Sequence, residues 1–303
     1  MLSVLVATIG YILLAFVFIL DKIILSKSVN KPVVYTFYST IFLLTVFLLY
    51  PLGVQTIFGV HLFWAIFSGL TFGFGMWLMF VALKKGETSH ISPFIGGVIT
   101  IATYTISYFL LNEQLSNFQL LGIGILIFSS FLLSFEKSRK HNGFHIGFIW
   151  AICAGILFAF SHVSAKYIYD LYPFLTGIVW TRGTTGLVGI ICLFFPSVWK
   201  LFKKKGKQKK AKTIEKKYAT SIIISTKVLS VVANLLIQYA IAIGSVTVVM
   251  ALSGLQFALM FLFIFLLTKF VPKIFREYFT YRELIVQTTA ILLVVVGYIF
   301  FVF

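Results

Sequence analysis

Ten long apolar segments constrain what this chain can fold into more than any other feature. A helix that crosses a membrane needs about 20 predominantly apolar residues. Such segments lie at residues 3–25, 33–52, 61–83, 89–111, 117–135, 146–168, 173–196, 220–243, 245–268 and 284–303. Only 11% of all residues are charged and 60% are hydrophobic, a composition that excludes a soluble domain. We therefore expect an all-α integral membrane protein with ten transmembrane helices.

Neither processing nor covalent cross-linking is predicted. The first apolar segment has no basic stretch before it and no small-residue cleavage site after it, so we expect a retained helix and not a signal peptide. The two cysteines, Cys153 and Cys192, lie inside apolar segments. We expect both to be small buried residues without a disulfide or a metal.

Positive charge is concentrated in alternate loops between the ten segments. The five odd-numbered loops hold 22 of the 25 Lys and Arg residues, and the basic loop 197–219 alone carries ten of them. By the positive-inside rule, odd loops face the cytoplasm and both termini face outward. We expect a multi-pass protein of the plasma membrane whose basic loops contact anionic lipid, and we expect no nucleic-acid partner.

The chain contains one structural unit twice. Aligning Ala82 with Ala240 superimposes two pairs of apolar segments, each pair joined by a short Gly turn, at a separation of 158 positions. The stretches AFVFILDKIIL and AFSHVSAKYIY also match. These matches predict two five-helix repeats, residues 1–138 and 144–303. Because five is odd, the second repeat enters the membrane from the opposite side, and inverted repeats of this kind transport substrates by alternating access.

Motifs in the first repeat resemble a known family. The segment that starts at Ala82 contains a basic pair at Lys84, a helix entered through Ser92 and Pro93, a Leu-x-Glu exit at Glu113 and then a Gly-containing helix. This pattern resembles the second part of an EamA domain of the drug/metabolite transporter superfamily. The resemblance implies a ten-helix transporter of small organic solutes.

Two features depart from that family. Val271 falls where the first repeat has Glu113, so the glutamate has no symmetric counterpart. Family members are often described with both termini in the cytoplasm, opposite to the charge distribution of this chain. We keep the outward assignment, because translocating the ten positive charges of loop 197–219 is the less favourable event.

Polar residues within the apolar segments define a candidate substrate site. Measured along each helix from its outer end, five of them lie about 8–16 Å deep. An ionisable group at such a depth usually faces a cavity or a partner. Tyr104 adds an aromatic surface for stacking. The candidates are Arg182, His162, Asn234, Gln238, Gln256 and Tyr104.

Each candidate also has a purely structural interpretation. Arg182 can pair with a helix carbonyl end or hold helices together, and His162 can be a hydrogen-bonded packing residue. Amides such as Asn234 and Gln238 commonly join membrane helices. Tyr104 belongs to a chain with 18% aromatic residues, so its position has little weight alone.

The distribution of charge favours an anionic or zwitterionic substrate. None of the eight acidic residues falls in the middle of an apolar segment, whereas Arg182 does, and its planar fork suits a carboxylate or phosphate. We expect an exporter or exchanger of small polar metabolites, such as amino acids, organic acids or nucleotide-like solutes. No cofactor is expected, and the protein is expected to be a monomer or a homodimer.

Three alternatives remain open at this point. A flippase for polyprenyl-phosphate-linked sugar or another lipid would also use an arginine against a phosphate. A structural or receptor role would be favoured by a packed interior without a cavity. An enzyme is not expected, because no nucleophile with a base, no pair of membrane carboxylates and no HExxH motif is present.

Overall fold

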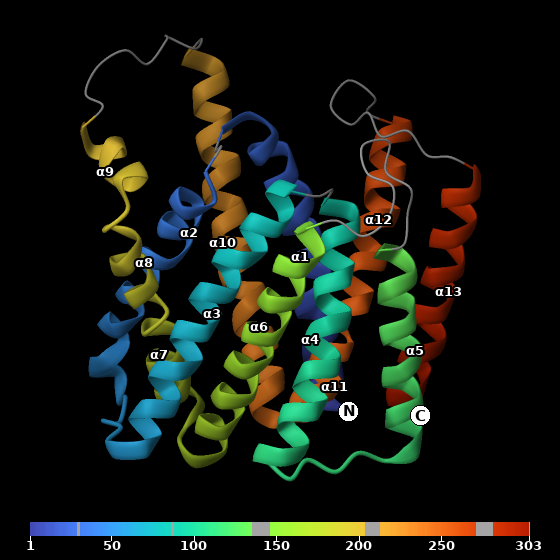
Figure 1. Ribbon diagram of the computed structural model, residues 1–303, viewed down its shortest axis with the longest axis horizontal. Helices are drawn as coiled ribbons and strands as arrows, with labels where there is room; N and C mark the ends of the chain where they lie inside the picture. Colours follow the sequence, from blue (N-terminus) through green and yellow to red (C-terminus); the bar gives the residue numbers. More distant parts are fainter. Residues whose placement is uncertain (29–30, 86–87, 135–145, 204–212, 271–280, 303) are drawn as a thin grey trace.

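The chain folds into a bundle of helices (Figure 1). The computed structural model describes residues 1–302 except 29–30, 86–87, 135–145, 204–212 and 271–280. Within these ranges it contains no β-strand. The elements are α1 (Leu2–Ser28), α2 (Pro32–Ile41), the 3₁₀ helix η1 (Phe42–Leu52), α3 (Gly59–Lys85), α4 (Thr88–Leu110), α5 (Asn117–Ser134), α6 (Ile146–Leu171), α7 (Phe174–Gly183), α8 (Gly186–Cys192), α9 (Pro196–Lys203), α10 (Thr213–Ile243), α11 (Val246–Ala251), α12 (Ser253–Phe270) and α13 (Tyr281–Val302).

The expectation of a multi-pass, all-α membrane protein is confirmed. In the described ranges, nine helical segments are long and apolar enough to cross a membrane. A shorter apolar stretch, Val228–Ile243, belongs to α10, which is 31 residues long. These nine to ten segments coincide with those predicted from hydropathy. An apolar segment in lipid must satisfy its backbone hydrogen bonds internally, so it forms a helix.

Three predicted segments are not single α-helices. Segment 33–52 changes from α-helix to 3₁₀ helix at Phe42, segment 245–268 is interrupted at Leu252, and segment 173–196 is interrupted at Thr184 and Thr185. The hydroxyls of Thr184 and Thr185 donate to carbonyls one turn earlier, at 2.7 and 3.4 Å. Such side-chain bonds compete with the helical ladder. Hydropathy does not report these interruptions, because apolar composition continues across them.

Helical structure also replaces part of the predicted basic loop 197–219. Helix α9 begins with Pro196 in the first turn, where proline suits a helix, and α10 already starts at Thr213. The range 197–219 therefore contains helical structure at both of its ends. Residues 204–212 lie outside the described residues.

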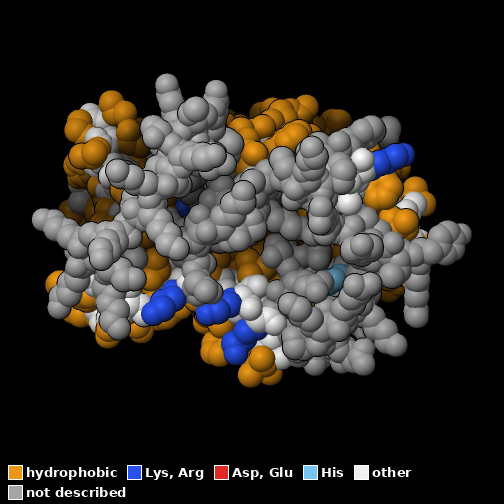
Figure 2. Space-filling model, turned by 90° about the horizontal axis from the view of Figure 1, so that it is seen from above, with side chains coloured by type: hydrophobic (Ala, Val, Ile, Leu, Met, Phe, Trp, Pro, Cys, Tyr) orange, Lys and Arg blue, Asp and Glu red, His pale blue; other side chains and the backbone are white. Residues whose placement is uncertain are grey.

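The two ends of the bundle differ in charge. Both termini lie at one end, which we call the termini end (Figure 1). Exposed lysines mark the opposite end: Lys31 precedes α2, Lys84 and Lys85 end α3, and Lys269 lies in the last turn of α12. We call this the basic end, and Figure 2 shows Lys and Arg side chains when the molecule is seen from above. The separation of charge agrees with the alternation of loops predicted from the sequence.

Helix packing brings segments that are far apart in the sequence into contact. Helix α3 packs along α6, α1 along α10, and α5 along α13, while α4 also packs on α6. The glycines Gly69, Gly73 and Gly75 of α3 allow its close approach to neighbours. A Cβ added at Gly69 would lie 2.1 Å from the Thr184 hydroxyl and 2.6 Å from the Thr185 nitrogen. The interruption between α7 and α8 is therefore seated directly against Gly69.

This contact makes Gly69→Ala a test of the packing. Since the added methyl group meets backbone atoms, we expect destabilisation of about 1–3 kcal/mol, typical of overpacking. The matched change Gly124→Ala meets no atom within 4 Å and is expected to be neutral or stabilising by up to about 1 kcal/mol. Thermal unfolding in detergent measures both. Equal stability of the two variants would contradict this packing.

Candidate functional site

Arg182 lies in the middle of the apolar segment Phe174–Cys192, near the end of α7. Its side chain is buried, with 8% of its surface exposed. The interruption that follows is held in place by the Thr184 hydroxyl, which donates to the Ala65 carbonyl of α3 at 3.1 Å. Arg182 therefore projects from a helix end that is tied to α3.

The guanidinium of Arg182 contacts α6 and α3. Nη1 donates to Ser161 Oγ and Nη2 meets His162 Nδ1, both at 3.5 Å, which is long for a hydrogen bond. Cζ lies 4.1 Å from the centroid of the Phe72 ring, a cation–π contact. The Tyr169 side chain interacts with the same guanidinium. These contacts hold the guanidinium plane between two helices.

No acidic side chain pairs with Arg182 in the part of the chain that the structure describes. The ion pair found there joins Lys166 to Asp170. The neighbours that influence the guanidinium are neutral groups. A buried charge without an opposite charge is unfavourable in hydrocarbon. The positive charge of Arg182 is therefore not neutralised by any described side chain, and a bound anion would neutralise it.

A chain of neutral hydrogen bonds surrounds the guanidinium. The Tyr169 hydroxyl donates to Gln238 Oε1 at 2.9 Å, and Gln238 Nε2 meets His162 Nδ1 at 3.5 Å. Arginine has no acceptor and the amide nitrogen is also a donor. Nδ1 of His162 is therefore an acceptor shared by these two long contacts, in the tautomer that carries its proton on Nε2. Tyr169 also meets Thr181 Oγ1 at 3.4 Å.

These six polar residues form what we call the Arg182 cluster. They come from α6, α7 and α10, and all are buried. The members are Ser161, His162, Tyr169, Thr181, Arg182 and Gln238.

Three of the six residues predicted for the site belong to this cluster, namely Arg182, His162 and Gln238. The structure does not join the other three to it by hydrogen bonds. Gln256 is buried in α12, and Tyr104 is partly buried on α4, with its ring centroid 6.4 Å from that of Tyr108.

Asn234 lies one turn from Gln238 toward the basic end. Its Nδ2 donates to the Ser230 carbonyl at 2.8 Å. Asn234 is exposed, although Gln238 and Ile241 on the same face of α10 are buried. This face of α10 is therefore less covered on the basic side of the cluster.

The sequence analysis missed four residues that contact Arg182 or its partners. Ser161 and Thr181 are sequence neighbours of predicted residues, and Tyr169 follows His162 by seven positions, which puts both on one face of α6. That spacing was an available signal. Phe72 is one of 35 phenylalanines, and nothing in the sequence distinguishes it.

Comparison with known proteins yields a structural relative and no family. No family model and no curated protein matches this chain. A solved structure described only as "Crystal structure of protein" has 17% sequence identity and a TM-score of 0.66, over 98% of this chain and 97% of that chain. At this identity the likeness shows the fold alone. The chain is a multi-pass, all-helical membrane protein whose whole length shares its fold with that structure.

The hydrogen bond between Tyr169 and Gln238 predicts the effect of Tyr169→Phe. Loss of the hydroxyl leaves the buried Gln238 carbonyl without its donor, which costs about 1–3 kcal/mol. Tyr167→Phe on the same helix is the matched control, since the Tyr167 hydroxyl takes no part in the cluster. Thermal unfolding in detergent compares the two variants. Similar melting temperatures would show that the 2.9 Å bond contributes no net stability.

Proposed function

We propose that this protein transports small polar metabolites that carry a carboxylate or phosphate, as an exporter or exchanger. The observation that carries the proposal is the buried guanidinium of Arg182, which has no acidic partner among the described residues. A transported anion would supply the missing charge. Its binding would be strong in this low-dielectric environment and reversible, because no protein group competes permanently for the same donors.

The surroundings of Arg182 suit a small polar solute. Ser161, His162 and Gln238 supply neutral hydrogen-bonding groups within reach of the guanidinium. Phe72 covers one face of the guanidinium and leaves its edges for in-plane hydrogen bonds. A carboxylate can be held by two parallel N–H bonds from such a fork. Amino-acid-like solutes and organic anions fit this chemistry.

The helix packing supports two inverted five-helix repeats, residues 1–138 and 144–303. The helices α1, α3 and α4 of the first repeat correspond to α6, α10 and α12 of the second. When each helix is replaced by its counterpart, the contact of α3 with α6 becomes that of α10 with α1, and the contact of α4 with α6 becomes that of α12 with α1. Both members of each pair are present, and α5 packs on its counterpart α13. This reciprocity is what a pseudo-twofold axis produces. It supports an alternating-access mechanism and a kinship with EamA-type transporters.

Interrupted helices lie beside the candidate residues. The interruption between α7 and α8 follows Arg182, and the one between α11 and α12 precedes Gln256 by four residues. Discontinuous helices at membrane depth free backbone groups for substrate, and transporters use them for that purpose. We assign both termini to the outside of the plasma membrane, because the exposed lysines of the basic end mark the cytoplasmic side.

Ligand-dependent thermal stabilisation tests this proposal. Purified protein in detergent is heated with amino acids, organic acids, nucleotides, cationic drugs or lipid-linked sugars. A bound solute at about 100 times its Kd stabilises the protein by about 2.7 kcal/mol. We expect an anionic or zwitterionic solute to stabilise the wild type and Arg182→Ala to abolish the shift. Lys269→Ala, which removes an exposed charge at the basic end, is the control and should keep it.

Other outcomes assign a different function. Stabilisation by cationic compounds alone, or an equal shift in Arg182→Ala, would contradict the proposal. Stabilisation only by polyprenyl-phosphate lipids would identify a flippase, since Arg182 can meet a lipid phosphate with the same fork.

A further inference from the structure

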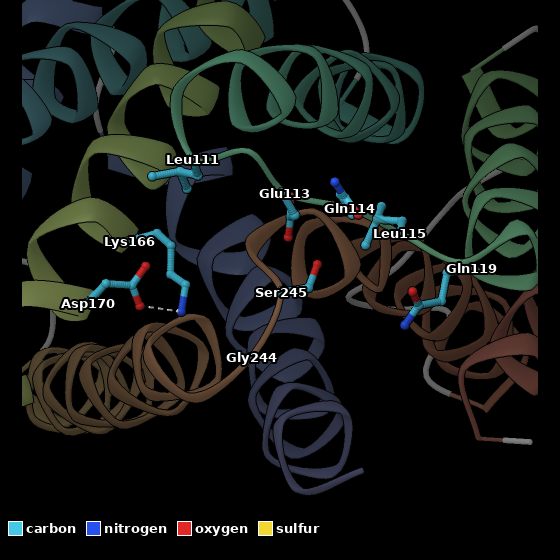
Figure 3. A pocket seen from close by; sticks show the side chains of 9 residues that line it. All are labelled: Leu111, Glu113, Gln114, Leu115, Gln119, Lys166, Asp170, Gly244 and Ser245. Carbon is cyan, nitrogen blue, oxygen red and sulfur yellow. Dashed lines mark ion pairs between the residues drawn. The ribbon is translucent and has the colours of Figure 1, made fainter.

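A hollow of about 300 Å³ opens at the termini end (Figure 3). Its lining comes from both predicted repeats: the connection between α4 and α5 faces the end of α6 and the turn between α10 and α11. A volume of this size accommodates a small metabolite. Two carboxylates and one ammonium group give the hollow its charge. The lining residues are Leu111, Glu113, Gln114, Leu115, Gln119, Lys166, Asp170, Gly244 and Ser245.

Glu113 is held in place through one of its two carboxylate oxygen atoms. The hydroxyls of Ser107 and Thr247 both donate to its Oε2, at 2.5 Å. Ser107 and Thr247 are fully buried, and Glu113 is partly buried. In the part of the chain that the structure describes, Oε1 accepts no hydrogen bond and no cationic side chain pairs with this carboxylate. Glu113 therefore lines the hollow with one anchored oxygen and one oxygen that has no protein donor.

Lys166 supplies the positive charge of the hollow from α6. Its Nζ donates to Asp170 Oδ1 at 2.8 Å and to the Ala242 carbonyl at 3.1 Å. A lysine ammonium has three N–H donors, so these two contacts leave one donor for a further partner. In Figure 3 the side chains of Lys166 and Asp170 approach from α6, and that of Glu113 from the α4–α5 connection. Two walls of the hollow thus offer a carboxylate oxygen and an ammonium donor.

Two helix caps order the walls that carry these groups. Gln119 Oε1 accepts from the backbone N–H of Ser116 at 3.0 Å, and Ser116 Oγ accepts from the backbone N–H of Gln119 at 3.3 Å, which is a capping box at the start of α5. Ser245 is the N-cap of α11, and its Oγ accepts from the Val248 N–H at 3.0 Å. The polar oxygens of Gln119 and Ser245 are therefore used within the protein, and the charged groups are left for a ligand.

The hollow adjoins the Arg182 cluster along two helices. Within the cluster, His162 of α6 meets Gln238 of α10. Lys166 and Ala242 lie four residues further along the same two helices, and they are joined by the 3.1 Å hydrogen bond. Four residues are about one turn, a rise of about 6 Å. The hollow is therefore the next layer of the bundle from the cluster toward the termini end.

We propose that the hollow is a second binding site, which takes a solute that carries both an ammonium and a carboxylate group, such as an α-amino acid. The ammonium donates to Glu113 Oε1, and the carboxylate accepts from Lys166 Nζ. Leu111 and Leu115 leave apolar wall for the side chain of the solute. The inference rests on the proposed transport function and narrows its substrate class to zwitterions.

The charges of the hollow disfavour other solutes. An organic anion without an ammonium group meets two carboxylates and a single ammonium, so it is repelled. An amine without a carboxylate leaves the third donor of Lys166 unused. A metal ion prefers several oxygen ligands, whereas Glu113 has one oxygen to spare.

Protection of a cysteine placed in the hollow tests the proposal in purified full-length protein. In a background of Cys153→Ala and Cys192→Ala, Gln114→Cys reports on the hollow and Phe58→Cys is the reference. Gln114 is exposed and lines the hollow, whereas Phe58 is 73% exposed and lies outside it. Maleimide labelling is measured with leucine, with isocaproate, which lacks the ammonium, and with isopentylamine, which lacks the carboxylate. O-phosphoethanolamine represents the headgroup of a zwitterionic lipid.

We expect leucine to slow the labelling of Gln114→Cys several-fold relative to Phe58→Cys, and isocaproate and isopentylamine to leave it unchanged at the same concentration. Glu113→Gln keeps the shape of the side chain without its charge and should lose the protection. Lys85→Gln, which removes an exposed charge at the basic end, is the control and should keep it.

Several outcomes would overturn the proposal. They are the absence of protection by leucine, equal protection by leucine and its two analogues, protection by O-phosphoethanolamine alone, and protection by leucine that persists in Glu113→Gln. The comparison of solutes uses the native Glu113, so it decides the question even where Glu113→Gln fails to fold.

Arg182→Ala separates this site from the Arg182 cluster. It should abolish the thermal stabilisation and keep the protection of Gln114→Cys, because weak binding in an open hollow adds little to the stability of the protein. Loss of the protection in Arg182→Ala would show that leucine acts through Arg182, and it would overturn the second site while the transport proposal stands. Failure of the transport proposal is read from the thermal measurement alone, so the two failures are distinguishable.

Discussion

The satisfaction of backbone hydrogen bonds within lipid is the constraint on which this structure depends. Hydrocarbon offers no partner for an N–H or C=O group, so each crossing must be helical over nearly its whole length. Where a helix is interrupted, protein groups take over. At the α7–α8 interruption the hydroxyls of Thr184 and Thr185 bond to carbonyls one turn earlier, and Thr184 also reaches α3. At this interruption the irregular backbone is enclosed by protein groups, next to Arg182.

The second constraint is the cost of an isolated charge. Arg182 is surrounded by neutral partners in the bundle interior. Its positive charge has no acidic partner among the described residues. For Arg182 we assign the balance to a transported anion. Lys166 and Asp170 provide the contrast, because they neutralise each other within one helix turn.

The fold was largely predictable from the sequence, and the site only in part. Apolar segments of about 20 residues and the placement of basic residues in alternate loops are local properties, and the residues that the structure describes agree with both. Arg182, His162 and Gln238 were predicted together because their depths agree. Asn234 shares that depth, yet it is exposed and bonds to its own helix. Depth along a helix is readable from a sequence, whereas the rotation of that helix toward its neighbours is not.

Contacts between segments that are far apart in the sequence could not be predicted. Glu113 was recognised as part of a motif, but its contact with Thr247 joins positions 134 residues apart. The proximity of Gly69 to Thr184, and of Phe72 to Arg182, likewise depends on how α3 lies against α6 and α7. The sequence by itself determined the membrane class, the presence of about nine to ten membrane-length apolar helices and the end at which the described basic residues gather, because these follow from local composition. Only the tertiary structure decided where helices are interrupted and which polar groups meet, because both depend on packing between distant segments.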